Sequence, residues 1–268
     1  MKGNKKPGAL STILYVISLL VWVGGMMYGL QCVIALVVYF LLGQSGLSAS
    51  LFNSIYSILS CIIVTVAVVL VPKWIAILKS EPNKPKKQSR SCREWLTSLM
   101  VELGLKDLPT WTDIGLALVS YIGYLLLALV FTSLFSIFPW FNADEAQDVG
   151  LSLFMSKPEL VVSFFAVVVI TPIAEEIIFR GFLYGKLREK LAEATSNKVS
   201  IALSVFLVSL LFGIMHRQWN VGVNVFALSI VLCALREVTG TIHASILLHM
   251  LKNGIAFFLI YVLGAGLL

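Results

Sequence analysis

The sequence predicts an all-α membrane protein, a polytopic bundle of about seven transmembrane helices, with eight as the alternative. Hydrophobic residues make up 59% of the 268 residues and charged residues only 13%, whereas a soluble domain is about half apolar and about a quarter charged. The mean hydropathy is +0.93, and several apolar runs reach the ~20 residues that a helix needs to cross a bilayer. The alternation typical of a membrane β-barrel is not found.

Seven apolar stretches are the expected spans. The first is one long span that follows a basic start and is expected to bend at Gly24 and Gly25. Proline cannot donate a backbone hydrogen bond and usually ends or kinks a helix, so Pro72 is expected to close the second span and Pro139 the third. In chain order the predicted spans are 9–42, 51–71, 114–138, 158–182, 199–215, 221–235 and 241–263.

Charge in the loops predicts the topology. Basic loops stay in the cytoplasm, so the N-terminus and the loop 73–113 are expected inside, and the acidic loop with Asp144, Glu145 and Asp148 outside. The net charge of +6 therefore reports topology, and no nucleic-acid partner is expected. Residues 94–105 are either an amphipathic helix at the membrane interface or a solvated connector. The basic residues on which this topology prediction rests are Lys73, Lys79, Lys84, Lys86, Lys87, Arg90 and Arg93.

The chain divides at about residue 112. Residues 1–112 form an expected two-span region with the basic cytoplasmic loop, and residues 113–268 form the expected functional core. The sequence has no evident internal repeat, which disfavours a transporter built from duplicated halves. No C-x-x-C occurs, and a disulfide framework or thiolate metal site is not expected. The four cysteines are Cys32, Cys61, Cys92 and Cys233.

Two adjacent carboxylates stand inside the fourth predicted span. Ionisable groups within a membrane are costly and usually functional. Glu176 and Arg180 are four residues apart in the favoured acid-first order, so they are expected to pair on one helix face. Glu175 points about 100° away, has no partner within its own turn and follows the kink expected at Pro172. It is therefore the better candidate for a general base, with structural pairing to neighbouring helices as the alternative.

The remaining candidate groups lie in later spans. Phe212 and His216 share one helix face, as do His249 and Asn253. His216 alone is equally typical of a helix end at the interface, and the His249–Asn253 pair of an interhelical polar clamp. His243 is expected to be an interface residue.

Together these groups supply a base, an orienting group and oxyanion donors, which is the inventory for hydrolysis by an activated water. The sequence has no His-Glu-x-x-His zinc helix. A zinc site from Glu175, His216 and His249 is chemically possible, although three helices would have to converge. The prediction is that no cofactor is required, with a divalent metal such as zinc as the alternative.

The ordered motifs Glu175-Glu176-x-x-x-Arg180, Phe212-x-x-x-His216 and His249-x-x-x-Asn253 resemble the CAAX protease and bacteriocin-processing (Abi) family of intramembrane endopeptidases. This family includes the type II CAAX prenyl endopeptidases. The resemblance covers about 158–263 and implies a membrane protease of helical fold. It implies that Glu175 and His216 activate water and that His249 and Asn253 form the oxyanion hole. Glu176, Arg180 and Phe212 would then be supporting residues.

The resemblance also implies a partner, namely a membrane-embedded or prenylated peptide or protein that is cleaved at the lipid bilayer of the plasma membrane. A non-catalytic immunity or scaffold protein and a proton-coupled transporter are the alternative functions. The expected topology conflicts with a site that contains both Glu175 and His216. Glu175 is placed toward the cytoplasmic half of its span, whereas His216 ends a span that runs outward and would lie too far out to meet it.

Overall fold

The computed structural model describes residues 8–79, 91–143 and 147–264. The basic N-terminal start, Asp144, Glu145 and the loop residues Lys84, Lys86, Lys87 and Arg90 lie outside the described residues. Seven helices of the described part are long and apolar enough to cross a membrane, and no strand occurs in it. The predicted all-α polytopic fold is thus confirmed.

The first, fourth and seventh spans each contain π-helical segments, here labelled η. The first span consists of α1 (Ala9–Gly25), η1 (Met26–Leu30) and α2 (Gln31–Leu42), so the helix changes type directly after the glycines at which a bend is expected. The fourth consists of α6 (Lys157–Phe164), η2 (Phe165–Ile170), α7 (Thr171–Glu176), η3 (Ile177–Tyr184) and α8 (Gly185–Ala194). The other spans are α3 (Ala49–Leu78), α5 (Trp111–Phe135), α9 (Asn197–Met215), α10 (Trp219–Thr239), and α11 (His243–Phe257) with η4 (Phe258–Val262). The shorter helix α4 (Cys92–Leu103) lies between α3 and α5 in the chain.

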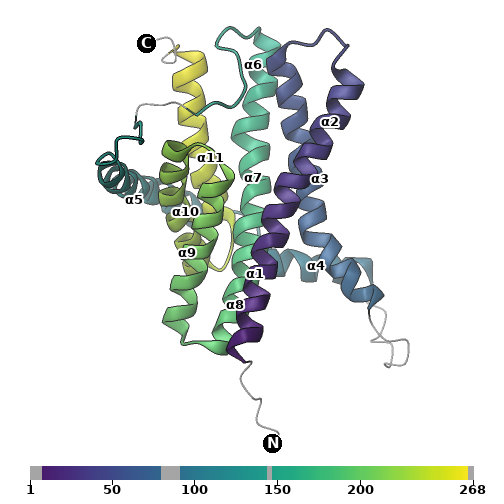
Figure 1. Ribbon diagram of the computed structural model, residues 1–268, viewed down its shortest axis with the longest axis vertical. Helices are drawn as coiled ribbons and strands as arrows, with labels where there is room; N and C mark the ends of the chain where they lie inside the picture. Colours follow the sequence, from purple (N-terminus) through teal and green to yellow (C-terminus); the bar gives the residue numbers. More distant parts are fainter. Residues whose placement is uncertain (1–7, 80–90, 144–146, 265–268) are drawn as a thin grey trace, which may run out of the picture.

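The long fourth helix runs through the middle of the bundle (Figure 1). The helices α1, α2 and α3 pack on one side of it, and α9, α10 and α11 on the other, with α5 against α10 and α11. The described chain starts at one end of the bundle and finishes at the opposite end. One apolar cluster joins residues of the first, second, fourth and fifth spans. This cluster contains residues from both sides of the division expected near residue 112, and the division itself stays a prediction.

Pro72 does not end the second span, as the sequence predicted, but lies inside α3, which continues to Leu78. A proline in a helix leaves the carbonyl four residues earlier without its donor, and in α3 that carbonyl belongs to Val68. The indole Nε1 of Trp22 donates to the Val68 carbonyl oxygen at 3.2 Å. The side chain from α1 therefore replaces the hydrogen bond that Pro72 cannot make, which lets the helix continue.

The fourth helix is also longer than predicted. It spans 38 residues, from Lys157 to Ala194, and does not end at Phe182. Glu175 consequently lies half-way along this helix and not toward one end of it. At Gly181 the carbonyl oxygen of Leu103 lies 3.0 Å from the position that a Cβ would occupy. A side chain at this position would push the end of α4 away by a few tenths of an ångström, so the glycine favours the close approach.

Most of the segment 94–105 is helical, as one of the two alternatives predicted, and the helix ends at Leu103. Ser91 and Glu94 form a capping box at the start of α4, in which each side chain satisfies a backbone N–H of the other residue. Figure 1 shows α4 crossing the end of the bundle at a large angle to the spans. Trp95 and Leu96 on this helix are exposed. A position at the membrane interface stays a prediction.

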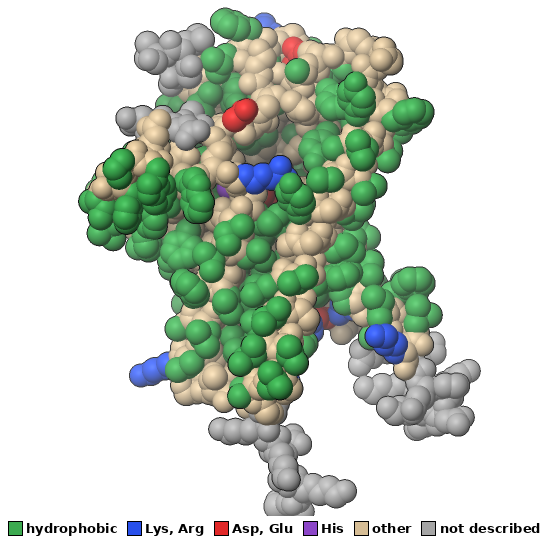
Figure 2. All heavy atoms as spheres, viewed as in Figure 1, with side chains coloured by type: hydrophobic (Ala, Val, Ile, Leu, Met, Phe, Trp, Pro, Cys, Tyr) green, Lys and Arg blue, Asp and Glu red, His purple; other side chains and the backbone are tan. Residues whose placement is uncertain are grey.

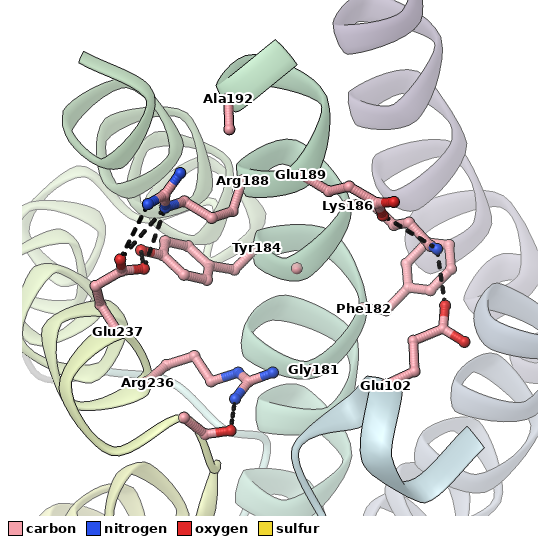
Figure 3. A pocket seen from close by; sticks show the side chains of 12 residues that line it. Glu102, Gly181, Phe182, Tyr184, Lys186, Arg188, Glu189, Ala192, Arg236 and Glu237 are labelled. Atoms are coloured by element: carbon pink, nitrogen blue, oxygen red, sulfur yellow. Dashed lines mark hydrogen bonds and ion pairs between the residues drawn. The ribbon is translucent and has the colours of Figure 1, made fainter. Parts of the chain in front are cut away.

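Charged residues hold α4 and the last turns of the fourth helix together at this end (Figure 3). Glu102 of α4 forms ion pairs with Lys73 of α3 and with Lys186 of α8, the latter at 2.8 Å. Burial alone would raise the pKa of Glu102, but the two ammonium groups outweigh it and hold that pKa below its usual value. Glu102 lines a cavity that Figure 3 shows from close by. On the other side of this cavity, Tyr184 donates to Glu237 of α10 at 2.6 Å.

Orientation in the membrane can be tested with one native and one introduced cysteine at opposite ends of the bundle. Cys92 at the start of α4 is exposed, and Phe154 precedes α6 at the other end with 81% of its surface exposed. With the other three cysteines replaced by alanine, a membrane-impermeant maleimide should leave Cys92 of intact cells unlabelled, because basic segments stay inside. The same reagent should label the Phe154→Cys variant. Labelling of Cys92 alone would reverse the predicted topology.

Candidate active site

A cavity of about 430 Å³ brings the four predicted catalytic residues together. Glu175 comes from α7, His216 from the turn between α9 and α10, and His249 and Asn253 from α11. The face drawn in Figure 2 is hollowed at mid-height, and basic, acidic and histidine side chains are visible in the hollow. The convergence of polar groups from three helices is the arrangement expected of a binding or catalytic site.

Glu176 is the buried member of the two adjacent carboxylates. Its Oε1 accepts from Arg180 Nη1 at 2.9 Å, and neither side chain is exposed at all. The i,i+4 pair predicted from the sequence is therefore formed. The same Oε1 is 2.9 Å from His249 Nδ1, a contact that the sequence did not predict. Because an ionised carboxylate only accepts hydrogen bonds, Nδ1 is the donor, and Glu176 fixes the imidazole of His249.

Glu175 has a different environment. Its side chain keeps 19% of its surface exposed and lines the cavity, and its Oε2 lies 3.7 Å from His249 Nε2. That distance is longer than a hydrogen bond. Glu175 has no ion pair with Lys or Arg among the described residues. Of the two adjacent acids, it is thus the carboxylate that small molecules can reach.

Phe212 lies at the centre of the aromatic and charged contacts behind the cavity. Its ring is 4.9 Å from the His216 ring and 5.9 Å from the His249 ring, both edge-on. The guanidinium of Arg180 lies over the same ring at 4.6 Å, within the range of a cation–π contact. Phe212 therefore restricts the positions of both histidines and of the cation that pairs with Glu176.

His216 is not too far out to meet Glu175, contrary to the expectation from the sequence. The two residues line one cavity, because Glu175 lies half-way along the long fourth helix. The His216 Nδ1 is 2.8 Å from the carbonyl oxygen of Phe212. A carbonyl only accepts, so Nδ1 carries the proton and the Nε2 of a neutral His216 is left as an acceptor.

Asn253 contacts the fourth helix next to its proline. Its Nδ2 donates to the carbonyl oxygen of Val167 at 3.1 Å, in the π-helical segment η2. In a π-helix a carbonyl accepts from the residue five positions on, which for Val167 is Pro172, and proline has no N–H. Asn253 replaces the missing donor, and the second N–H of its amide remains for another acceptor.

Two further polar residues belong to the seventh span, and one of them was not predicted as part of the site. His243 is buried and bonds through Nε2 to the carbonyl oxygen of Asp107, away from the cavity. Lys252 was missed, although it lines the cavity between His249 and Asn253. The rule that a charge inside a span signals function would have found it from the sequence.

A metal is the alternative that the sequence left open. Glu175, His216 and His249 offer donor atoms that zinc accepts. Among the described residues, however, no group of three or more His, Cys, Asp and Glu side chains is placed so as to hold a metal ion. The residues as arranged do not form the ligand set, and the requirement for a metal stays a matter for experiment.

Comparison with known proteins gives one match. The family model described as type II CAAX prenyl endopeptidase Rce1-like matches residues 157–255. Searches of curated proteins and of solved structures gave no match. The matched segment contains Glu175, Glu176, Arg180, His216, His249 and Asn253. Residues 157–255, which carry every predicted site residue, are therefore similar to the Rce1-like type II CAAX prenyl endopeptidases.

Proposed function

We propose that the protein is an intramembrane endopeptidase that hydrolyses a peptide bond with water activated by Glu175. The observation that carries the proposal is the unequal environment of the two adjacent acids. Glu176 is fully buried and bound to Arg180 and His249, whereas Glu175 is partly exposed in a cavity that it shares with two histidines and an amide. A general base needs that access to water and substrate.

In the proposed reaction, a water molecule in the cavity donates hydrogen bonds to the Glu175 carboxylate and to His216 Nε2. Glu175 takes a proton as the water oxygen attacks the carbonyl carbon of the substrate. The carbonyl oxygen becomes an oxyanion. As this oxyanion reforms the carbonyl, the C–N bond breaks and the proton passes from Glu175 to the departing amine nitrogen. The tautomer that the Phe212 carbonyl imposes on His216 supports the role of its Nε2 as an acceptor.

Two donors are proposed for the oxyanion. The first is the second amide N–H of Asn253, since the first is used by Val167. The other is the Nε2 of His249, which donates when the ring is doubly protonated. Nε2 faces Glu175 at 3.7 Å, while Nδ1 on the opposite side of the ring contacts Glu176 at 2.9 Å. Donors fixed before the reaction stabilise a developing charge without reorganisation, and the Glu176 contact supplies that fixation for His249.

The family implies a membrane-associated substrate, and a prenylated protein is the class that we propose, at the plasma membrane. Substrate trapping tests the function directly. A purified Glu175→Gln variant should retain peptides from solubilised membranes, because binding remains while the base is lost. The parent protein should cleave the peptides that are identified in this way. Failure of the parent to cleave any of them would refute the proposal.

The proposal includes independence from metal ions. The base, the acceptor for water and the oxyanion donors are all side chains, and none requires a bound cation for its role. Activity of the purified protein should therefore persist after dialysis against a chelator. Activity that disappears with the chelator and returns only on addition of a divalent ion would contradict this prediction.

A further inference from the structure

Lys252 is a cation inside the candidate site that the proposed reaction does not use. It lies on α11, three residues after His249 and beside Asn253, and its side chain lines the same cavity. Residues three apart share a helix face, so Lys252 and His249 belong to one side of the cavity. The lysine also lies near the middle of a membrane span that runs from His243 to Val262.

Several other cations of the membrane spans are paired with acids. Arg180, Lys186 and Arg188 each form an ion pair with a carboxylate. Lys252 has neither a hydrogen bond nor an ion pair among the described residues. A charge within the bilayer is costly unless an opposite charge compensates it. Lys252 therefore lines the cavity without a carboxylate in ion-pair contact among the described residues.

The carboxylates of the cavity do not pair with Lys252. Glu175 is close enough for its charge to act on Lys252, but it forms no ion pair with it and is the acid that must remain accessible to water. Asp148 is exposed in the connection before α6, and its Oδ1 accepts from the backbone N–H of Gly150 at 2.8 Å. Neither acid neutralises Lys252 directly.

We propose that Lys252 binds a carboxylate of the substrate and so gives the enzyme a preference for peptides with an acidic group beside the scissile bond. The inference rests on the proposed function, which identifies the cavity as the place where a peptide substrate binds. It concerns recognition of that substrate and not the chemical step. An ammonium group is a compact point charge with three donors. It can pair with either a C-terminal carboxylate or the side chain of Asp or Glu, and the two sources of the carboxylate can be separated by experiment.

The test uses binding, so it does not depend on turnover. The probe is a fluorescent octapeptide with a palmitoyl chain, prepared in three forms: with a free C-terminal carboxylate, with a C-terminal amide, and with that amide plus one internal Gln→Glu change. Fluorescence anisotropy in detergent gives the affinity of each form. The parent protein should bind at least one carboxylate form about tenfold or more tightly than the neutral amide form, as expected for a hydrogen-bonded charge.

Three variants give the controls. Lys252→Met should abolish the preference, and Lys252→Arg should retain most of it. Lys157→Met, which removes an exposed lysine at the start of α6, should leave it unchanged. Whichever carboxylate form binds more tightly identifies the source of the anion.

Equal binding of all three forms by the parent, or no binding of any form, would overturn the inference. A Lys252→Met variant that keeps the carboxylate preference would also overturn it. So would a Lys252→Met variant that binds all three forms equally more weakly, since the lysine would then act on Glu175 or on the fold. Cleavage of the same peptides is scored separately. A carboxylate preference without cleavage supports the inference and counts against the proposed function. Cleavage without a carboxylate preference supports the proposed function and overturns the inference.

Discussion

Replacement of Glu175 by glutamine should lower the rate of peptide hydrolysis at least about 100-fold, the lower end of the range for loss of a general base. The amide keeps the volume of the side chain but takes no proton from water. Because Glu175 is partly exposed and has no ion pair with Lys or Arg among the described residues, the folded protein should lose little stability. Single-turnover assays on purified protein and thermal unfolding in detergent measure the two effects separately.

Glu189→Gln is the matched control for this experiment. It makes the same chemical change at a carboxylate on α8 that is 71% exposed and lies outside the cavity, so it should cleave as the parent does. If Glu175→Gln also cleaves at the parental rate, the proposed role of Glu175 is wrong.

Removal of one partner of the buried Glu176–Arg180 pair should instead act mainly on stability. Breaking a buried pair leaves an uncompensated charge, which costs about 3–5 kcal/mol, and neither side chain has any exposed surface. Arg180→Met should therefore lower the unfolding temperature strongly. Glu176→Gln should do so too, with a loss of activity smaller than that of Glu175→Gln, because the amide oxygen can still accept from His249 Nδ1.

An exposed pair provides the comparison. Lys190→Met removes a partner of Glu193, half of whose side chain is exposed, and should change the free energy of unfolding by less than about 1 kcal/mol. A double variant, Glu176→Gln with Arg180→Met, should be less destabilised than the sum of the two single variants, since both charges are then removed. Equal effects of the buried and exposed substitutions would refute the stability role of the pair.

The sequence predicted those parts of the protein that depend on local spacing and hydropathy. The Glu176–Arg180 pair follows from i,i+4 geometry, and the seven spans follow from apolar runs. The contact between Glu176 and His249 joins residues that are far apart in the chain, and no local pattern encodes it. The gathering of Glu175, His216, His249 and Asn253 was predicted only through the family resemblance.

The errors concern helix length. Hydropathy marks where a helix is apolar and not where it ends, and α8 continues the fourth helix with charged residues such as Lys186 and Arg188. The predicted end at Phe182 moved Glu175 too close to one surface and separated it from His216. The predicted end of the second span at Pro72 was wrong for a related reason. The donor that allows the helix to continue comes from Trp22, in another span.

The two prolines inside the spans make separate parts of the chain depend on one another during biosynthesis. A carbonyl without a donor costs several kcal/mol in the hydrocarbon interior. The helix around Pro72 obtains its donor from Trp22, which is synthesised earlier. The helix around Pro172 obtains its donor from Asn253, which is synthesised about eighty residues later. The central helix thus stays incompletely bonded until the seventh span has inserted, so a nascent chain completes its cavity only when that span is in place.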